Sequence, residues 1–374
     1  MSILTPAERR LPVSIITGFL GSGKTTLLNR LLQHPGMAGA AVIINEFGEI
    51  GLDHLLVATP NENTVLLASG CICCTVRGDL VDTLRDLFSR RRDGDIPAFD
   101  RVVIETTGLA DPVPIIQTVV TDEELAPWFR LDSVVTLVDS VNGMLQLDQH
   151  AESVKQAAVA DRLLITKTDL AAPAVIDALQ ARLARINPGA RTSAVVHGGI
   201  APESLFGAAL SGAEAGRHDV ARWLGDAAFP GAEPVSMHDH AHAAHDVNRH
   251  DDHIRAFSIH LDQPVSSAGL TAWLTVLTSL RGANLLRVKG LLNVEGRPVA
   301  VHAVQTLIHE PLTLAQWPDA DRRSRLVFIT RDMAREDIEA TLDVLRWQGT
   351  PRQPRQTLDP QAYAKFLAAM ERFH

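Results

Sequence analysis

The sequence predicts an α/β fold in which a mostly parallel sheet is flanked by helices, followed by a smaller α+β domain. Three observations support this prediction. Over roughly the first 200 residues, short runs of β-branched residues alternate with helical patterns, as in a parallel sheet built from βαβ units. Most of these runs are apolar throughout, which is typical of strands covered on both faces. The length of 374 residues also exceeds what one hydrophobic core usually serves, so two domains are expected.

The strands expected in the first domain are short and follow one another along the chain. They cover residues 13–17, 41–45, 64–68, 101–105, 133–139, 162–166 and 192–196. Between them, apolar residues recur at helical spacing, as at Leu80, Leu84, Leu87 and Phe88 and again at Val175, Leu179, Leu183 and Ile186. The pattern predicts that helices connect the strands.

Composition changes near residue 208, and this change divides the chain. Residues 208–253 are rich in Gly, Ala, Asp and His and lack sustained periodicity, apart from a helical turn at VARWL. They are expected to link a first domain at 1–207 to a second at 254–374. In the second domain the pattern predicts strands at 254–261, 285–294, 298–308 and 325–331 and helices at 267–280 and 335–346. These elements indicate a small α+β domain with a meander.

Charge and hydropathy exclude several classes of protein. The net charge of −9 argues against a broad nucleic-acid surface, which needs a basic excess, and the run at residues 90–92 is expected to be a solvated helix end. No run reaches the ~18 apolar residues of a membrane span, and the apolar stretch near the N-terminus is too short for a secretory signal. We therefore expect a cytoplasmic protein that contacts neither membranes nor nucleic acids.

The strongest motif is GFLGSGKTT at residues 18–26, which follows a predicted strand and opens a predicted helix. This is the P-loop pattern, in which backbone N–H groups and a helix N-terminus surround phosphate oxygens. Lys24 is expected to reach the terminal phosphates and Thr25 to bind Mg²⁺. The sequence thus predicts a P-loop NTPase fold with nucleotide contacts at Gly18, Gly21, Ser22, Gly23, Lys24, Thr25 and Thr26.

Two further motifs follow later strands of the same sheet. In ETTGLADP, Glu105 ends a strand, where a carboxylate can bind Mg²⁺ directly or through water, and the Gly108 N–H can meet a γ-phosphate. In TKTD, residues 166–169, the carboxylate of Asp169 can accept both N–H donors of guanine, which adenine lacks. This motif predicts GTP as the nucleotide, with Thr166 and Lys167 beside the base, and residues 193–195 as a second wall of the base pocket.

All three cysteines of the chain lie in GCICC, as Cys71, Cys73 and Cys74, directly after the strand predicted at 64–68. Redox activity and inert buried thiols are the two alternatives to metal binding. A disulfide within so short a segment is strained, and cytosolic thiols stay reduced. Three thiolates favour Zn²⁺ or Cu⁺ and leave a fourth tetrahedral position for another ligand.

Candidates for that fourth ligand lie in two other segments. Glu46 and Glu49 in NEFGEIGLD follow the second predicted strand, and Glu46 is preferred. If this loop touches metal and nucleotide, one movable element couples the two sites. The linker segment HDHAHAAHDVNRHDDH predicts loose, exchangeable binding of Zn²⁺, Ni²⁺ or Co²⁺, with a solvated spacer as its alternative. Its histidines are His238, His240, His242, His245, His250 and His253.

These motifs, taken in order, resemble the CobW-type GTPases, a group of P-loop metallochaperones. The resemblance rests on GFLGSGKTTLLNRLL, NEFGEIGLD, GCICC, ETTGLADP and TKTD, with LLRVKGLL and LVFIT in the second domain, and covers nearly the whole chain. It implies a cytosolic GTPase whose Cys-x-Cys-Cys motif binds metal, commonly zinc, and delivers it to a client metalloprotein. It also implies roles by position: metal ligands at Cys71, Cys73 and Cys74, phosphate and Mg²⁺ contacts at Lys24 and Thr25, and guanine recognition at Asp169.

One position departs from the family pattern. Thr166 stands where the guanine motif usually has Asn, and a hydroxyl cannot reproduce the two-sided hydrogen bonding of an amide. Selectivity for guanine over other bases is therefore expected to be lower.

The hypothesis at this stage is that GTP orders residues 45–53 and 105–111 and presents a Cys-bound metal to a client, while hydrolysis resets the site. Lys24, Thr25 and Glu105 are the expected catalytic residues. Turnover is expected to be slow, because no arginine finger or catalytic glutamine can be assigned. The alternatives are a P-loop small-molecule kinase, a metal-buffering protein and a redox-sensing GTP-binding protein. Cobalt, iron or nickel can replace zinc in this hypothesis, and both a monomer and a dimer are compatible with the sequence.

Overall fold

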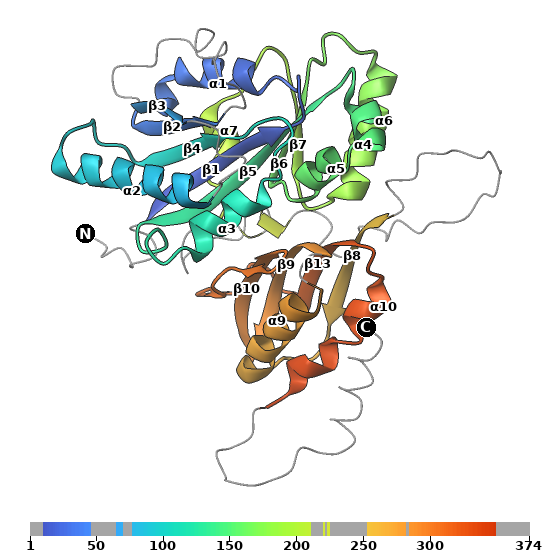
Figure 1. Cartoon of the computed structure of the whole chain (residues 1–374). Helices are drawn as coiled ribbons and strands as arrows, with labels where there is room; N and C mark the ends of the chain where they lie inside the picture. The colour runs from blue at the N-terminus through green and yellow to red at the C-terminus, as the bar shows by residue number, and fades with distance from the viewer. Residues whose placement is uncertain are drawn as a thin grey trace.

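The structure, a computed structural model, describes residues 10–45, 65–69, 77–210, 220, 223–224, 253–281 and 284–348. These residues form two bodies, each built on its own sheet (Figure 1). The predicted fold class, a parallel sheet flanked by helices followed by a smaller domain with strands and helices, is confirmed. No helix in these ranges is long and apolar enough to cross a membrane.

The first body contains a parallel sheet of seven described strands in the spatial order β3-β2-β4-β1-β5-β6-β7. Every strand expected from the sequence is present. β5 begins earlier than expected, because its polar start is satisfied inside the fold: buried Asp132 accepts hydrogen bonds from Ser14 Oγ at 3.0 Å and from the Gly207 amide at 2.7 Å. The strands are β1 Leu11–Gly18, β2 Ala40–Asn45, β3 Val65–Ser69, β4 Arg101–Glu105, β5 Phe129–Asp139, β6 Arg162–Thr166 and β7 Arg191–Val195.

Helices cover both faces of this sheet (Figure 1). Alternate residues of the central strands point to opposite faces, as the period of a strand requires. Ile15 and its neighbours on one face pack with α2 and α3, whereas Ile16 and its neighbours on the other pack with α1. The helices and the 3-10 turn described in this region are α1 Lys24–Leu32, η1 Pro35–Met37, α2 Arg77–Asp93, α3 Val113–Thr121, α4 Gly143–Gln149, α5 Ala151–Ala158, α6 Pro173–Ile186 and α7 Pro202–Leu205.

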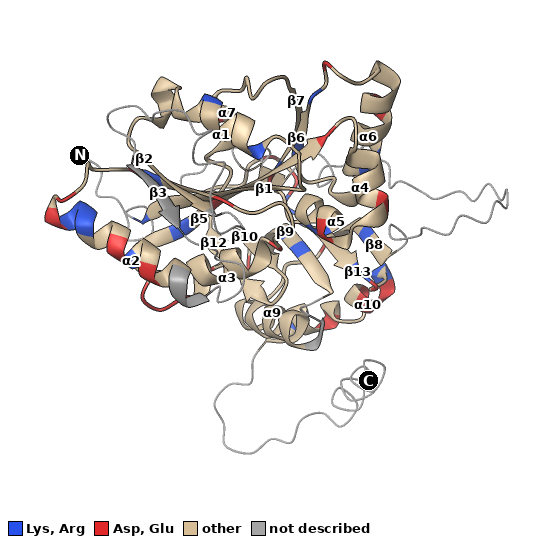
Figure 2. Cartoon of the chain, turned by 45° about the horizontal axis from the view of Figure 1, so that its top comes forward, with Lys and Arg blue, Asp and Glu red and all other residues tan. Residues whose placement is uncertain are grey.

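The basic run at residues 90–92 lies in the last turn of α2, as expected of a solvated helix end. Figure 2 shows acidic and basic residues interspersed along this helix. Arg90 pairs with Asp86 at 3.6 Å and Arg92 with Asp93 at 2.9 Å, and all four side chains are largely exposed. Arg91, between them, donates from Nε to the Phe99 carbonyl at 2.8 Å, so all three arginines of the run have partners within the fold.

The second body contains an antiparallel sheet in the order β11-β10-β9-β13-β8, with β12 added beside β10. Helix α9 covers one face, where Trp273 and Leu277 pack on Val288 and Phe328. The predicted meander holds for β9, β10 and β11, whereas β13 lies between β9 and β8. The elements are β8 Ile254–Leu261, α9 Ser267–Arg281, β9 Leu285–Val294, β10 Arg297–Val304, β11 Leu307–Ile308, β12 Leu312–Thr313, β13 Ser324–Arg331, α10 Arg335–Glu339 and η5 Leu342–Arg346.

Two expected elements of this body are interrupted. The strand predicted at 298–308 is β10 and β11, because Gln305 adopts a left-handed φ of 53° and reverses the chain. The helix predicted at 335–346 is α10 followed by the 3-10 helix η5. The Thr341 hydroxyl at the break donates to the Ile338 carbonyl at 2.7 Å and accepts from Trp273 Nε1 at 2.9 Å, which fixes the kink.

Part of the predicted linker belongs to the core of the second body. Val220, Trp223 and Leu224 are helical, as the VARWL pattern indicates, and are buried against Leu291 and Val327 on the sheet face opposite α9. An apolar i, i+3, i+4 pattern is enough to dock a short helical turn on a sheet.

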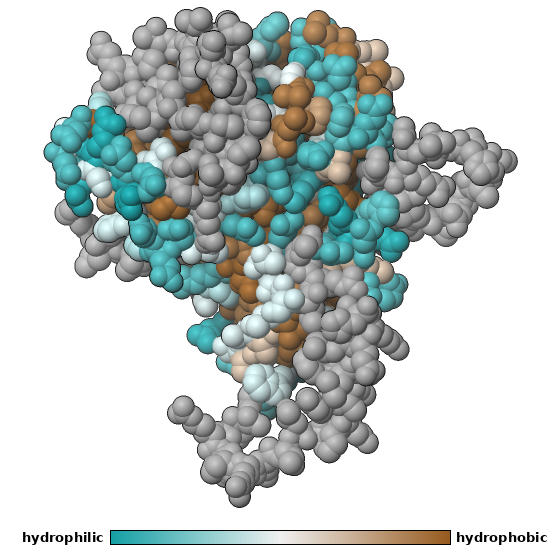
Figure 3. Space-filling model, in the orientation of Figure 1, coloured by the Kyte–Doolittle hydropathy of each residue, from teal (hydrophilic) through white to brown (hydrophobic). Residues whose placement is uncertain are grey.

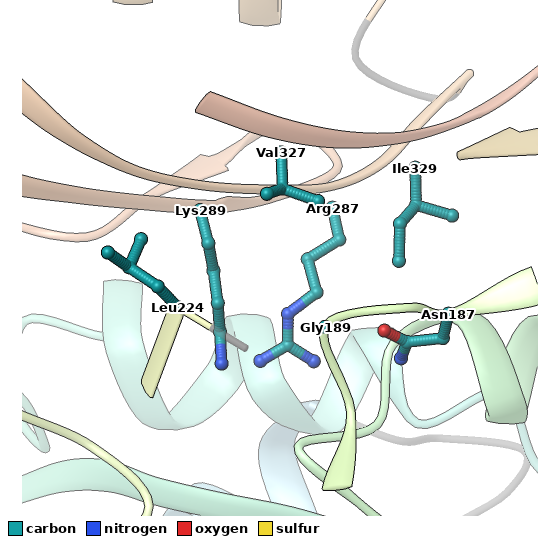
Figure 4. Close-up of a pocket in the computed structure, with 7 residues that line it drawn as sticks. All are labelled: Asn187, Gly189, Leu224, Arg287, Lys289, Val327 and Ile329. Atoms are coloured by element: carbon teal, nitrogen blue, oxygen red, sulfur yellow. The ribbon is translucent and has the colours of Figure 1, made fainter. Parts of the chain in front are cut away.

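Charged side chains join the two bodies. Buried Asp161, between α5 and β6, accepts a hydrogen bond from Lys289 Nζ at 2.9 Å and pairs with Arg287, both on β9. Figure 4 shows the Arg287 and Lys289 side chains extending side by side from the sheet, with Leu224 on the side of Lys289 and Asn187 on the side of Arg287. The cavity beside them measures about 10 Å³, which is room for about one water molecule. The contact is therefore closely packed as well as charged.

Candidate functional site

The motifs predicted to bind nucleotide and metal follow strands that end at one edge of the parallel sheet. Ile16 of β1 and Ile44 of β2 are both in register with Glu105 at the end of β4. On the other side of β1, Asp139 at the end of β5 is in register with Thr166 at the end of β6. Ligands of open α/β sheets bind at the carboxyl ends of the strands, so this edge is the candidate site.

The P-loop turns sharply out of β1 because Gly18 has no side chain. Its φ is +143°, and a Cβ there would lie 2.4 Å from the Leu137 carbonyl oxygen. Gly21 and Gly23 adopt left-handed φ values of 73° and 94°. These conformations favour glycine and turn successive backbone amides toward the inside of the loop.

The groups that would meet phosphate lie at the start of α1. Lys24 Nζ donates to the carbonyls of Gly18 and Phe19 at 2.8 and 3.3 Å, which holds the ammonium group over the loop. The N-cap residue of α1 is Gly23, which has no side chain to cap the helix, and buried Ser22 has a hydroxyl oxygen without a described hydrogen-bond partner. The loop therefore keeps polar groups suited to a phosphate. Thr25 and Thr26 are in the first turn of α1, as predicted.

Glu105 lies where the sequence predicts, as a buried carboxylate at the end of β4. The next residue fastens the following loop to β1: Thr106 N donates to the Ile16 carbonyl at 3.0 Å, and Thr106 Oγ1 donates to Thr17 Oγ1 at 2.8 Å. Gly108 packs against the P-loop so closely that a Cβ there would lie 2.7 Å from the Leu20 nitrogen. The two loops are therefore in direct contact.

The TKTD segment is joined to the P-loop by its first residue. Thr166 Oγ1 donates to the Ser22 carbonyl at 2.7 Å, and Ser140 N donates to the Thr166 carbonyl at 3.0 Å. The Val138 carbonyl lies farther from the same hydroxyl, at 3.4 Å. The hydroxyl has one proton, so Thr166 supplies the bond to the P-loop although it lacks the second donor of an amide. Lys167 adopts a left-handed φ of 57°.

Asp139 is a residue of this site that the sequence prediction missed. Lys167 Nζ donates to Asp139 Oδ2 at 2.8 Å, and the Val141 amide donates to Oδ1 at 2.8 Å. Burial raises the pKa of Asp139, but the hydrogen bonds from Lys167 and Val141 outweigh burial and hold this pKa below its usual value. A strand ending in LVD before a predicted turn was the signal that could have identified it. Asp139 fixes the lysine that follows Thr166.

Asp169 is exposed and is approached by the segment that follows β7. His197 Nε2 lies 3.8 Å from Asp169 Oδ2, and the side chain of His197 is 83% exposed. Val195, in the predicted second wall, is in register with Thr166 on the neighbouring strand. The residues predicted to surround the base thus come from β6, β7 and the segments after them.

Several exposed apolar side chains belong to the segments of this edge. Leu20, Leu109 and Leu145 each have more than half of their surface exposed, at 53%, 56% and 55%. Gln146 Nε2 donates to the Leu20 carbonyl at 3.4 Å, which links α4 to the P-loop. Figure 3 shows apolar patches among polar residues on the face of the first body that it displays.

Most of the predicted transition-metal ligands lie outside the residues that the structure describes. This applies to Glu46, to the three cysteines and to the linker histidines His238, His240, His242, His245 and His250. His253 is described, and its imidazole pairs with Asp332. Within the described ranges, no group of three His, Cys, Asp or Glu side chains is arranged to hold a metal ion. Of the strands that precede these segments, β2 and β3 are neighbours, and Asn45 at the end of β2 is in register with Ser69 at the end of β3.

Comparison with known proteins identifies relatives along nearly the whole chain. The family model for the CobW/HypB/UreG nucleotide-binding domain matches residues 12–194, and the model for the cobalamin synthesis protein cobW C-terminal domain matches residues 254–346. The chain is 36% identical over 338 residues to the zinc chaperone YjiA of Escherichia coli, an alignment that covers 90% of this chain and 99% of YjiA. It is 29% identical over 379 residues to the zinc chaperone CobW of a Sinorhizobium species, covering 90% and 98%.

A solved structure agrees with this relationship. The crystal structure of the Zn(II)-bound YjiA GTPase from Escherichia coli has a TM-score of 0.65 to this fold and 31% sequence identity, and the match covers 90% of this chain and 99% of that one. The match extends over both domains of this chain. The chain belongs to the CobW family, with a CobW/HypB/UreG nucleotide-binding domain followed by a CobW C-terminal domain.

Proposed function

We propose that this chain is a GTP-hydrolysing metallochaperone that binds a transition metal, zinc first among them, and delivers it to a client metalloprotein. The observation that carries the proposal is the register of β2 and β3. Asn45 and Ser69 are paired, and neighbouring strands lie about 5 Å apart. Glu46 follows Asn45 directly, and Cys71 follows Ser69 by two residues. A glutamate and a cysteine motif therefore start from adjacent strand ends.

The proposed metal ligands are Cys71, Cys73 and Cys74, with Glu46 as the fourth. Thiolate and carboxylate donors in this number suit a tetrahedral zinc ion. The names of the relatives support zinc, since YjiA and the Sinorhizobium CobW are both called zinc chaperones. A second YjiA structure, in which one glutamate and two cysteines are replaced by alanine, is also Zn(II)-bound, so weaker zinc sites elsewhere in the chain are part of the proposal. The linker histidines are proposed to supply such sites.

GTP is proposed to bind along the same sheet edge. The P-loop and Lys24 hold the phosphates, Thr25 and Glu105 hold Mg²⁺, and Asp169 accepts from guanine. Mg²⁺ would neutralise charge that develops on the transferred phosphoryl group. The contact between Gly108 and Leu20 supports one further step, in which the loop after Glu105 responds to the γ-phosphate. Strand β2 lies directly beside β4. We therefore propose that the segment beginning at Glu46 also responds to the γ-phosphate, through the loop after Glu105.

The first experiment tests nucleotide and reaction. Hydrolysis of GTP and ATP is measured on the purified chain, together with phosphate transfer to added metabolites. The proposal predicts slow hydrolysis of GTP in preference to ATP and no transfer, and Asp169→Asn is expected to reduce the preference. Its control is Asp177→Asn, an exposed acidic position on α6. Equal use of ATP, or transfer to a metabolite as in a P-loop kinase, would contradict the proposal.

The second experiment tests the metal site. Zinc affinity is measured by competition with a chromogenic chelator under reducing conditions. Cys73→Ser is expected to weaken zinc binding by more than about tenfold, because the tetrahedral site loses one of its proposed ligands. Replacing His238, His240, His242 and His245 by Ala is expected to remove only weak sites, with His260→Ala on β8 as the control. Unchanged affinity in the Cys73 variant would refute the ligand assignment, and oxidation of the thiols in place of metal binding would favour a redox sensor.

A further inference from the structure

A glutamine on α5 holds the loop that follows Glu105. Gln156 Nε2 donates to the carbonyls of Ala110 at 2.9 Å and Gly108 at 3.2 Å. The two carbonyls flank Leu109, so one amide group is hydrogen-bonded to both ends of a single turn. Gln156 is only 1% exposed, and hydrogen bonds formed at so buried a position are expensive to break.

The other end of the same amide lacks a partner. Gln156 Oε1 is buried and has no hydrogen-bond partner among the described residues. Turning the amide over would place this oxygen against two carbonyl oxygens, so the orientation with the NH₂ group toward the loop is the one that the surroundings permit. An unsatisfied buried acceptor costs about 1–3 kcal/mol, which indicates that the side chain is retained for its contacts with the loop.

Neighbouring contacts restrict the loop from two further sides. Lys155, next to Gln156 on α5, forms an ion pair with Asp111, and Asp111 Oδ1 accepts from the Val113 amide at 3.0 Å. On the opposite side, Gly108 lies against Leu20 of the P-loop without room for a Cβ. The turn at 108–110 is thus held between α5 and the P-loop, and Gln156 is its one double hydrogen bond among the contacts described.

We infer that Gln156 is a positioning residue for GTP hydrolysis, which orients the 108–110 turn so that its backbone meets the γ-phosphate. This inference rests on the proposed function, because it takes the 105–111 loop as the segment that faces the γ-phosphate. Gln156 touches neither GTP nor the reacting atoms; it acts through the carbonyls of Gly108 and Ala110. GDP has no γ-phosphate, so GDP binding should not depend on Gln156.

The test uses Gln156→Met, which keeps the length of the side chain and removes both donors. The expected result is a fall in kcat for GTP of about 10- to 100-fold, the scale on which misplacing a reactive group slows an enzyme. The dissociation constant for GDP should change by less than about twofold. Gln149→Met, at the exposed end of α4, is the matched control and should leave both quantities unchanged.

Gln156→Glu supplies a readout that a purely structural role would not give. A carboxylate facing two carbonyl oxygens in a buried site has its pKa raised, and its protonated form can donate one hydrogen bond. The kcat of this variant, relative to the wild type at each pH, should therefore rise as the pH falls from about 8 to about 6. This series answers the question even if Gln156→Met does not fold.

The outcomes distinguish this inference from the proposed function. If the wild type hydrolyses GTP and Gln156→Met does so at the same rate, the inference is overturned and the proposed function stands. A flat pH profile for Gln156→Glu also overturns it. If the wild type itself does not hydrolyse GTP, both are overturned.

Discussion

Replacing Asp161 by Asn should weaken the contact between the two bodies more than any other single charge removal in that interface. Asp161 is 6% exposed, and its partners Arg287 and Lys289 are 3% and 5% exposed. Its Oδ2 also accepts from the Val134 amide at 3.0 Å. Asn has nearly the same volume, so the substitution removes one negative charge and leaves the packing in place.

The expected loss of folding free energy in Asp161→Asn follows from the positive charges that remain buried. Burial raises the pKa of Asp161, but the positive charges of Arg287 and Lys289 outweigh burial and hold it well below its usual range. Burial lowers the pKa of Lys289 to about 8, although Asp161 opposes this change. Breaking a buried ion pair costs about 3–5 kcal/mol. Without Asp161 the pKa of Lys289 should fall further, and loss of its proton near pH 7 limits the cost to about 3 kcal/mol, the lower end of that range.

The assay is urea unfolding of the full chain at pH 7, followed by circular dichroism and tryptophan fluorescence, because two bodies need not unfold in one transition. Lys289→Met and the double variant complete a mutant cycle. The control is Asp262→Asn, whose side chain is 81% exposed and lies 3.9 Å from Arg323, and which should cost less than about 0.5 kcal/mol. A cost below about 1 kcal/mol for Asp161→Asn, together with no coupling to Lys289, would refute the reasoning.

Three further predictions concern other residues of the fold. Burial lowers the pKa of His309 to about 4 from 6.5, so below pH 6.5 the unfolded chain binds more protons than the folded chain. Above pH 6.5 the free energy of unfolding should not depend on His309, and between pH 6.5 and about pH 4 it should fall by at most about 1.4 kcal/mol per pH unit. His309→Phe should reduce this pH dependence when the free energy is measured by urea unfolding at several pH values. An unchanged pH dependence would contradict the prediction. Thr166→Ala removes the donor to the Ser22 carbonyl and should weaken GDP binding about tenfold, for a lost bond of about 1–3 kcal/mol, whereas Thr166→Ser should restore it in a fluorescent-GDP titration. Gly18→Ala forces a methyl group against Leu137 and should abolish GDP binding. Gly21→Ala has open space around it and should reduce the binding free energy of GDP by only about 1–2 kcal/mol, because alanine is strained in the left-handed backbone conformation. Equal effects of the two variants would argue against the loop geometry.

The parallel sheet could be predicted from the sequence because each strand is an apolar run bounded by turn residues. The same is true of the order of the motifs, since parallel strands place their carboxyl ends on one edge. What the periodicity could not reveal were interruptions that depend on single residues. Gln305 breaks one expected strand through its backbone conformation, and Thr341 breaks one expected helix through its side-chain bonds.

Contacts between residues far apart in the sequence could not be predicted. Gln156 lies 48 residues from Gly108, and Arg287 lies 126 residues from Asp161. Neither Gln156 nor Asp161 belongs to a recognisable motif, because α5 and the segment after it look like an ordinary amphipathic connection. The importance of these residues comes from the packing of α5 between the loop after Glu105 and the second body, which only the fold brings about.

The central claim is that the nucleotide governs the metal held by the cysteine motif. Its most direct test is the zinc dissociation constant of the reduced chain, measured with GDP and with a non-hydrolysable GTP analogue, for the wild type and for Cys73→Ser. The claim predicts that the two nucleotides change zinc affinity by at least about fivefold, the lower end of allosteric coupling, and that Cys73→Ser removes the difference. Equal zinc affinity with both nucleotides in the wild type would contradict the claim and leave a metal-buffering protein in its place.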